Sequence, residues 1–138
     1  MSYKYLEHST DAFIEVKAKN LEEAFSVAGK SVVETIIDLE NIQEIEEKSI
    51  KVKGRNLLNL LYNWLEEIVT ITITDGFAIK KFSVNIKKNT EYEIVSKVSG
   101  EKLDLKKHNF KIEIKSPTFH LMEIKENDEI TMKYILDL

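Results

Sequence analysis

Four polar residues, His8, Ser9, Thr10 and Asp11, stand together just before a segment in which apolar and polar residues alternate. They include the three residue types of a hydrolytic triad. Neighbouring residues of an extended chain project to opposite faces, however, so Ser9 and His8 cannot readily hydrogen-bond to each other. Two interpretations remain open from these residues alone: an ordinary polar turn, or part of a binding site held at the edge of a strand.

A second acidic position lies near the other end of the sequence. Asp137 is in a strongly β-patterned segment, and the α-carboxylate of Leu138 is one residue away from its side chain. Acidic groups this close repel each other unless solvent or a cation intervenes. If the fold brings Asp11 near them, Mg²⁺, Mn²⁺ or Ca²⁺ is the natural occupant, because these ions favour oxygen ligands. The alternative is a solvated chain end.

The three histidines, at positions 8, 108 and 120, are far apart, and no pair has the His-x-x-x-His spacing of a helical zinc site. A zinc site would require the fold to gather them; otherwise each histidine is satisfied by a backbone or carboxylate partner. The sequence contains no cysteine, which excludes disulfides and thiolate chemistry within it. No G-x-S-x-G, Walker or dinucleotide-binding motif is present. The residues indicate no self-contained catalytic machine.

Basic residues gather in the middle of the chain, where residues 80–115 contain ten lysines and five acidic residues between two net acidic segments. Within this part, residues 100–108 hold three lysines and a histidine, and Lys111 and Lys115 are expected on one face of the following strand. Such an edge could bind a phosphate backbone or an acidic partner. It could equally be a solvated strand edge, or pair with the acidic segments on folding.

The length of 138 residues fits a single domain spanning residues 1–138. Asn20, with Glu23 three residues later, has the spacing of a capping box. The apolar spacing predicts helices over 21–37 and 56–68, and strands over 12–18, 44–53, 77–87, 92–98, 110–115, 120–125 and 130–138. The dipeptides Asp75-Gly76, Asn89-Thr90, Ser99-Gly100 and Asn127-Asp128 predict turns. The expected fold class is α+β: a single two-layer domain with two long helices packed on a mostly antiparallel β-sheet.

No apolar run suits a signal core or a membrane span, so we expect a cytoplasmic protein without membrane contact.

The chain resembles the archease family over nearly its whole length. The resemblance rests on the order and spacing of several short motifs together. They are residues 8–11 (HSTD) for H-T-A-D, 21–25 (LEEAF) for L-E-E-A-F, 64–67 (WLEE) in the second helix, 100–108 for G-E-x-x-D-x-x-x-H, 115–120 (KSPTFH) for K-A-x-T-Y-H, and 136–138 (LDL) for the closing D-I. Phe119 stands where the family has tyrosine, and Pro117 suggests an edge position or a strand end.

This resemblance implies an accessory role in RNA ligation. Archeases assist the guanylylating RNA-splicing ligase, so the chain would promote the GTP-dependent guanylylation of such a ligase and its multiple turnover in tRNA splicing and RNA repair, without turnover of its own. The family's divalent metal ion would be held by Asp11, Asp137 and Leu138. Lys115, with His8 and His120, would belong to the surface that meets the ligase. GTP would be used through that partner, and RNA contacted only indirectly.

Two other functions compete with this interpretation. The first is a stand-alone metal-dependent hydrolase that uses Asp11 with His8 or His120 and acts on a small phosphate or ester substrate without a partner. The second is a general nucleic-acid-binding module built on residues 80–115, whose RNA affinity would fall steeply with salt. Arg55 is the sole arginine and the chain carries a net charge of −4, and both facts argue against the second function.

Overall fold

The computed structural model describes residues 2–6 and 11–138, so His8, Ser9 and Thr10 lie outside the described residues. Seven strands, two α-helices and one π-helical turn make up the described chain. In chain order they are β1 (Ser2–Leu6), β2 (Asp11–Ala18), α1 (Leu21–Ile36), β3 (Glu46–Gly54), α2 (Leu57–Val69), the π-helical turn η1 (Thr70–Thr74), β4 (Phe77–Lys88), β5 (Tyr92–Lys102), β6 (Ser116–Glu126) and β7 (Ile130–Asp137).

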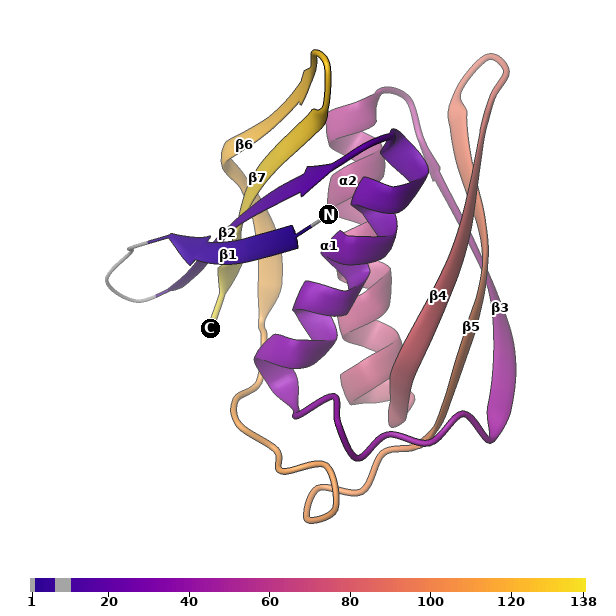
Figure 1. Cartoon of the computed structure of the whole chain (residues 1–138), viewed down its shortest axis with the longest axis vertical. Helices are drawn as coiled ribbons and strands as arrows, with labels where there is room; N and C mark the ends of the chain where they lie inside the picture. The colour runs from indigo at the N-terminus through magenta and orange to yellow at the C-terminus, as the bar shows by residue number, and fades with distance from the viewer. Residues whose placement is uncertain (1, 7–10) are drawn as a thin grey trace.

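The strands form two antiparallel sheets, and both helices lie between them (Figure 1). One sheet has the strand order β1-β2-β7-β6 and the other the order β3-β5-β4. Helix α1 contacts β2 and β4, and α2 contacts β3 and β6, so each helix joins the two sheets. The α+β class and the two long helices are confirmed, but the expected single two-layer arrangement on one sheet is wrong. Alternation identifies a strand without naming its partner, so it does not reveal a second sheet.

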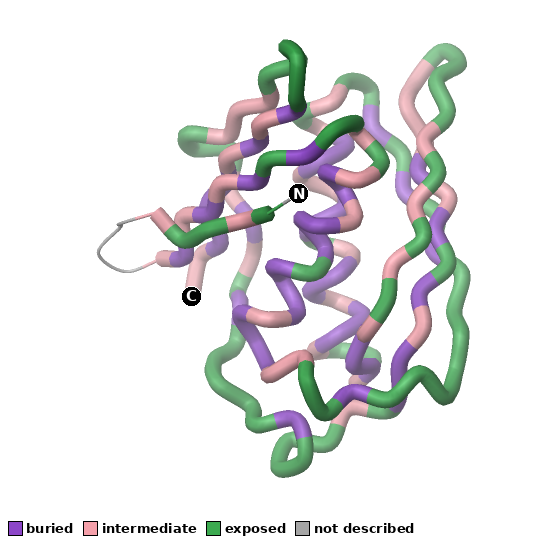
Figure 2. The backbone as a smooth tube through the Cα atoms, in the orientation of Figure 1, coloured by how far each residue is buried: buried purple, intermediate pink, exposed green. Residues whose placement is uncertain are grey.

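Both helices begin at an asparagine that caps them. Asn20 Oδ1 accepts a hydrogen bond from the Glu23 N–H at 2.9 Å, and Asn56 Oδ1 accepts one from the Asn59 N–H at 2.8 Å. These contacts satisfy backbone donors that the first helical turn leaves without a partner. Buried residues then follow the helices and the inner faces of both sheets in one continuous core (Figure 2). In the described parts of the chain, no helix combines the length and apolar character needed to cross a bilayer.

A pair of buried hydroxyl groups attaches β7 to α1. The Tyr134 and Ser31 hydroxyl oxygens are 2.6 Å apart, and neither residue is exposed to solvent. Ser31 Oγ donates its proton to the carbonyl oxygen of Ala28 at 2.7 Å, so Tyr134 must be the donor to Ser31. Burial raises the pKa of Tyr134, which keeps the phenol protonated. This contact fixes the four-stranded sheet against the first helix.

Residues 110–115 do not form the expected strand. They belong to the long connection between β5 and β6, where the Lys111 N–H donates to the Ile36 carbonyl oxygen at 2.8 Å. Phe110 and Ile112, whose alternation indicated a strand, are 39% and 40% exposed. The segment therefore runs along the end of α1 without forming a strand, and its last residue, Lys115, donates its N–H to the Asp137 carbonyl oxygen of β7.

The predicted turn at Ser99-Gly100 is also wrong, because both residues lie within β5. Gly100 is paired with Ile79, and the register of β4 shifts between Ile79 and Lys81. A Cβ atom at position 100 would collide with the carbonyl oxygen of Ala78. The glycine thus allows close approach of two strands at a bulge, which is another common use of glycine in a sheet.

Strand β1, which the sequence pattern did not predict, pairs with β2.

Candidate metal site at the start of β2 and the end of β7

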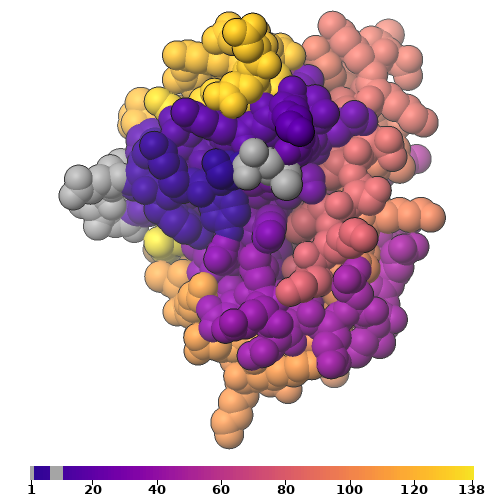
Figure 3. Space-filling view, in the orientation of Figure 1, coloured from indigo at the N-terminus to yellow at the C-terminus, as the bar shows by residue number. Residues whose placement is uncertain are grey.

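The paired strands β2 and β7 bring together two acidic residues that are far apart in the sequence. In their antiparallel register, Asp11 lies directly opposite Asp137. Residues paired in this way share one face of a sheet, with Cβ atoms roughly 4.5–5.5 Å apart. Both residues are partly exposed, and the carboxyl end of β7 reaches the surface beside β1 and β2 (Figure 1; Figure 3). The proximity on which a metal site depends is therefore present.

A cavity of about 390 Å³ opens beside this acidic pair and is lined by both Asp11 and Leu138. Its remaining wall comes from β1, the start of β2, the last turns of α1 and the connection before β6, through Tyr5, Ala12, Glu34, Thr35 and Lys111. The Tyr5 hydroxyl lies 2.9 Å from Thr35 Oγ1. Thr35 Oγ1 in turn donates to a backbone carbonyl oxygen of α1 at 2.8 Å, so Tyr5 is the donor of the first bond.

Lys111 brings a positive charge to the same cavity, although sequence reasoning placed it on a strand face with Lys115. Its Nζ atom lies 3.1 Å from an Asp38 carboxylate oxygen and donates to the Glu34 carbonyl oxygen at 2.8 Å. Hydrogen bonds from Asn109 and Lys111 lower the pKa of Asp38, which keeps this carboxylate ionised. No spacing in the sequence relates Lys111 to Asp11, because only the path of the connection between β5 and β6 brings Lys111 to this cavity.

The donor atoms at the start of β2 and at the end of β7 fit a hard divalent cation. Asp11 and Asp137 supply carboxylate oxygens, and Leu138 supplies oxygen from its backbone. Ca²⁺, Mg²⁺ and Mn²⁺ prefer such ligands, whereas zinc sites are built mainly from nitrogen and sulfur. Within residues 2–6 and 11–138, no three His, Asp or Glu side chains gather into a metal-binding cluster. An ion held here would therefore have coordination positions left for water or for a partner's ligands.

The backbone of Lys115 lies next to the acidic pair. Its N–H donates to the Asp137 carbonyl oxygen at 2.8 Å, and its exposed side chain starts from the residue just before β6. The side chain lines a different cavity, of about 270 Å³, together with Glu66 and Glu113. Lys115 and Lys111 therefore serve different surfaces, and the expected two-lysine face does not exist.

His120 lies on the edge strand β6, in an exposed stretch where pairing with β7 is interrupted between Thr118 and Glu123. The neighbouring Phe119 stacks on Tyr62 of α2, with ring centroids 4.4 Å apart and an angle of 9° between the planes. Strand β7 separates β6 from β2, so His120 is not brought beside the acidic residue of β2. The geometry gives no support to a hydrolase that combines Asp11 with His120. The other candidate histidine for that hydrolase, His8, lies outside the described residues.

The Gly-Glu-x-x-Asp-x-x-x-His segment forms a buried hydrogen-bond network. His108 is fully buried, its Nε2 donates to a Glu101 carboxylate oxygen at 2.9 Å, and its Nδ1 accepts from the Asp104 N–H at 3.0 Å. Hydrogen bonds from Lys107, His108 and the Gln43 N–H lower the pKa of Glu101 to about 2. The expectation that a histidine is satisfied by carboxylate and backbone partners is confirmed here. The segment orders the connection between β5 and β6.

Several lysines of residues 80–115 pair with acidic residues. Lys97 lies 3.9 Å from Glu47, and Lys107 lies 2.8 Å from Glu101. The exposed Lys97–Glu47 pair contributes little to stability, whereas Glu101 is buried; both pairs offset the positive charge of the segment. The mixed surface favours pairing on folding over a continuous nucleic-acid-binding face.

Comparison with known proteins identifies the family to which this arrangement belongs. The model of the Archease protein family matches residues 3–138. Protein archease of Pyrococcus abyssi is 34% identical over 125 residues, which cover 90% of this chain and 88% of the relative. Protein archease of Methanopyrus kandleri is 32% identical over 140 residues, with complete coverage of both chains.

Solved structures agree with this result. The solution structure of Methanobacterium thermoautotrophicum protein 1598 matches with a TM-score of 0.84 and 30% identity, over 99% of this chain and 98% of that one. A crystal structure from Thermotoga maritima, described as an archease and possible chaperone, has the same fold with a TM-score of 0.62 and 22% identity, over 98% and 96% of the two chains. The family match, the relatives and the shared fold together show that this chain belongs to the archease family.

Proposed function

We propose that this protein is a metal-binding accessory protein that activates a guanylylating RNA-splicing ligase by promoting its GTP-dependent guanylylation and multiple turnover. The observation that carries the proposal is the register that sets Asp11 opposite Asp137. Two carboxylates held on one face of a sheet repel each other, and a divalent cation relieves that repulsion. Membership of the archease family supports the choice of a ligase as the partner.

Each residue of the site has a distinct role in this proposal. Asp11, Asp137 and Leu138 hold the ion, which when bound supplies positive charge that can be offered to phosphate oxygens at the ligase's nucleotide site. Lys115 lies at the same end of the sheet, because its N–H is bonded to the Asp137 carbonyl oxygen. Its exposed ammonium group is available to a phosphate or to a carboxylate of the partner. GTP and RNA are bound by the ligase, so this protein meets RNA only indirectly.

Calorimetric titration with Mn²⁺ tests the metal site directly. We expect binding by the parent protein and its loss in Asp11→Ala, in Asp137→Ala and in a chain ending at Leu136. Asp128→Ala is a matched control, since Asp128 is an exposed acid in the turn between β6 and β7. Equal binding by all variants would show that the acidic pair does not hold the ion.

Guanylylation of a purified RNA-splicing ligase then tests the activity. The parent protein should increase the yield of ligase–GMP with Mn²⁺ present, and Asp11→Ala and Asp137→Ala should not. Lys115→Ala should bind Mn²⁺ like the parent and yet stimulate the ligase less. Full stimulation by both aspartate variants would refute the proposed role of the metal.

A further inference from the structure

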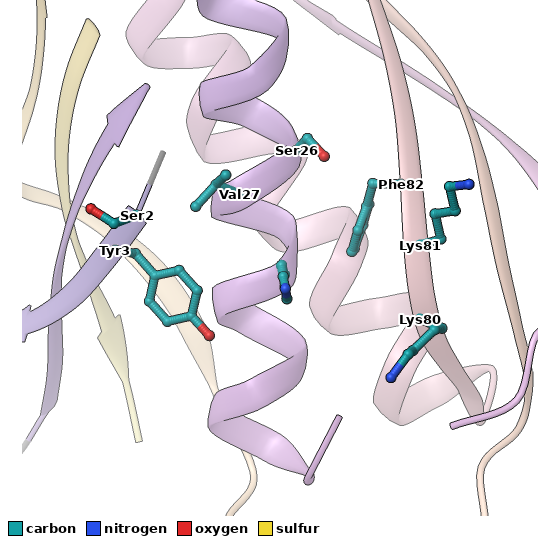
Figure 4. A pocket seen from close by; sticks show the side chains of 8 residues that line it. Ser2, Tyr3, Ser26, Val27, Lys80, Lys81 and Phe82 are labelled. Atoms are coloured by element: carbon teal, nitrogen blue, oxygen red, sulfur yellow. The ribbon is translucent and has the colours of Figure 1, made fainter. Parts of the chain in front are cut away.

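A second cavity, of about 430 Å³, lies between β1, α1 and β4, and is separate from the acidic pair. Its size falls within the range of roughly 300–1,000 Å³ typical of small-molecule sites. The lining side chains come from three elements that are far apart in the sequence (Figure 4): Ser2 and Tyr3 from β1, Ser26, Val27 and Lys30 from α1, and Lys80, Lys81 and Phe82 from β4.

The charge of this cavity is positive. Three lysines line it, and no acidic side chain of the described residues does. Lys80 extends its ammonium group from β4 toward α1, whereas Lys81 points away from the helix (Figure 4). The Lys80 ammonium group is also held by a hydrogen bond to the Leu39 carbonyl oxygen at 2.9 Å. Lys80 and Lys30, which lie on β4 and α1 respectively, thus supply cationic donors from two sides of the cavity.

One wall of the cavity is an aromatic ring with a fixed position. Phe82 is partly exposed, and its ring lies 6.0 Å from that of Trp64 in an edge-to-face arrangement. The ring also lies against Gly29 of α1, where an added Cβ atom would be only 2.7 Å from it. The glycine therefore lets the ring rest directly on the helix. The buried Val27 extends this apolar wall, and the Tyr3 hydroxyl points toward α1 from the opposite side (Figure 4).

We propose that this cavity binds a small phosphate monoester that carries a planar ring. The phosphate group lies near the ammonium groups of Lys30 and Lys80, which act as compact charged donors to its oxygen atoms. The Ser26 and Tyr3 hydroxyls are additional donors. The ring lies against Phe82, since aromatic faces and edges attract one another beyond simple burial of apolar area. This site is independent of the metal site and of the ligase.

Phenyl phosphate is a suitable probe, and the protein contains its own reporter. Trp64 is the single tryptophan of the chain and packs against Phe82, so binding should produce a saturable change in tryptophan emission. The Phe82 ring resonances should shift in nuclear magnetic resonance spectra. Lys30→Gln and Lys80→Gln should each raise the Kd about tenfold, the effect of losing one charge-assisted hydrogen bond. Titrations without divalent metal keep the result separate from the acidic pair.

Three comparisons make the test decisive. Lys51→Gln removes the same charge from an exposed position on β3, and should bind like the parent. Phenol and inorganic phosphate should each bind more weakly than phenyl phosphate, because each lacks one half of the ligand. Equal weakening by Lys51→Gln, equal binding of phenol, or no saturable change with phenyl phosphate would overturn the proposal.

Discussion

Asp137→Asn should change stability in opposite directions without and with metal. Asp11 lies directly opposite Asp137. Like charges at such paired positions are destabilising, and we take the cost to be comparable to the roughly 0.2–1 kcal/mol that an opposite-charge pair contributes. Coulomb's law gives a similar value, about 1 kcal/mol for two unit charges 4 Å apart in water. The amide removes this repulsion and keeps the shape of the side chain. Without metal and at low salt, we therefore expect the variant to be roughly 0.2–1 kcal/mol more stable than the parent.

Metal should reverse this order. An ion at one hundred times its Kd stabilises the parent by about 2.7 kcal/mol. If the variant binds ten or more times more weakly, its gain falls to about 1.4 kcal/mol or less, because each factor of ten in affinity is worth about 1.4 kcal/mol. The difference of about 1.3 kcal/mol exceeds the advantage of the variant without metal, so the parent should be the more stable of the two once Mn²⁺ is added.

Urea unfolding followed by Trp64 fluorescence measures both halves of this prediction. The experiment needs four conditions, with and without Mn²⁺ and at low and high salt. The gain of Asp137→Asn without metal should vanish near 1 M salt, where the screening length is about 3 Å. Asp128→Asn is the control, since it makes the same charge change at an exposed turn. If Asp137→Asn is no more stable than Asp128→Asn without metal, the reasoning about repulsion is wrong.

Two further predictions concern buried polar contacts. Ser31→Ala leaves the buried Tyr134 hydroxyl without its acceptor, and should lower the free energy of unfolding in urea by about 1–3 kcal/mol. Tyr134→Phe removes one hydrogen bond and leaves no polar group unsatisfied, so it should cost only about 0.5–1.5 kcal/mol in addition to a small packing effect. A larger cost for Tyr134→Phe would contradict the donor assignment. Glu101, whose pKa is lowered to about 2 by hydrogen bonds from Lys107 and His108, should stabilise the fold above its ordinary pKa of 4.5 and lose this contribution as the pH falls from 4.5 toward 2. Urea midpoints at pH 6 and pH 3 should therefore differ less in Glu101→Gln than in the parent, and an equal difference would exclude this carboxylate as a source of acid sensitivity.

Local signals in the sequence predicted the local structure well. The spacing of Asn20 and Glu23 predicted the start of α1, and Asn20 Oδ1 does accept a hydrogen bond from the Glu23 N–H. The apolar stripe of α2 gave a helix because residues three and four apart share a face of a helix. Pro117, which indicated an edge position, lies on the edge strand β6. Each of these signals depends only on residues a few positions apart.

The errors arose where distant segments decide the outcome. The division of the strands into two sheets depends on pairing between residues as far apart as Asp11 and Asp137, which no short pattern encodes. Gly100 indicated a turn, but it permits close contact with the backbone of Ala78, a residue of another strand. The acidic pair was proposed from its residue types and from a family resemblance, and the register supplied the proximity. The lysine cavity between β1, α1 and β4 gave no signal in the sequence, because its residues come from three separate segments.

The inner position of β7 also bears on how the protein is synthesised. A ribosome makes the chain from its amino end, so β3, β4 and β5 are all complete before β6 and β7 exist. β7 is the last strand in chain order, yet it lies between β2 and β6 in its sheet. Until residues 130–137 are made, β2 and β6 have unpaired edges, which are prone to pair with other chains. We therefore expect the nascent chain to close its three-stranded sheet on the helices first, and to need protection from aggregation until β7 has left the ribosome and paired with β2 and β6.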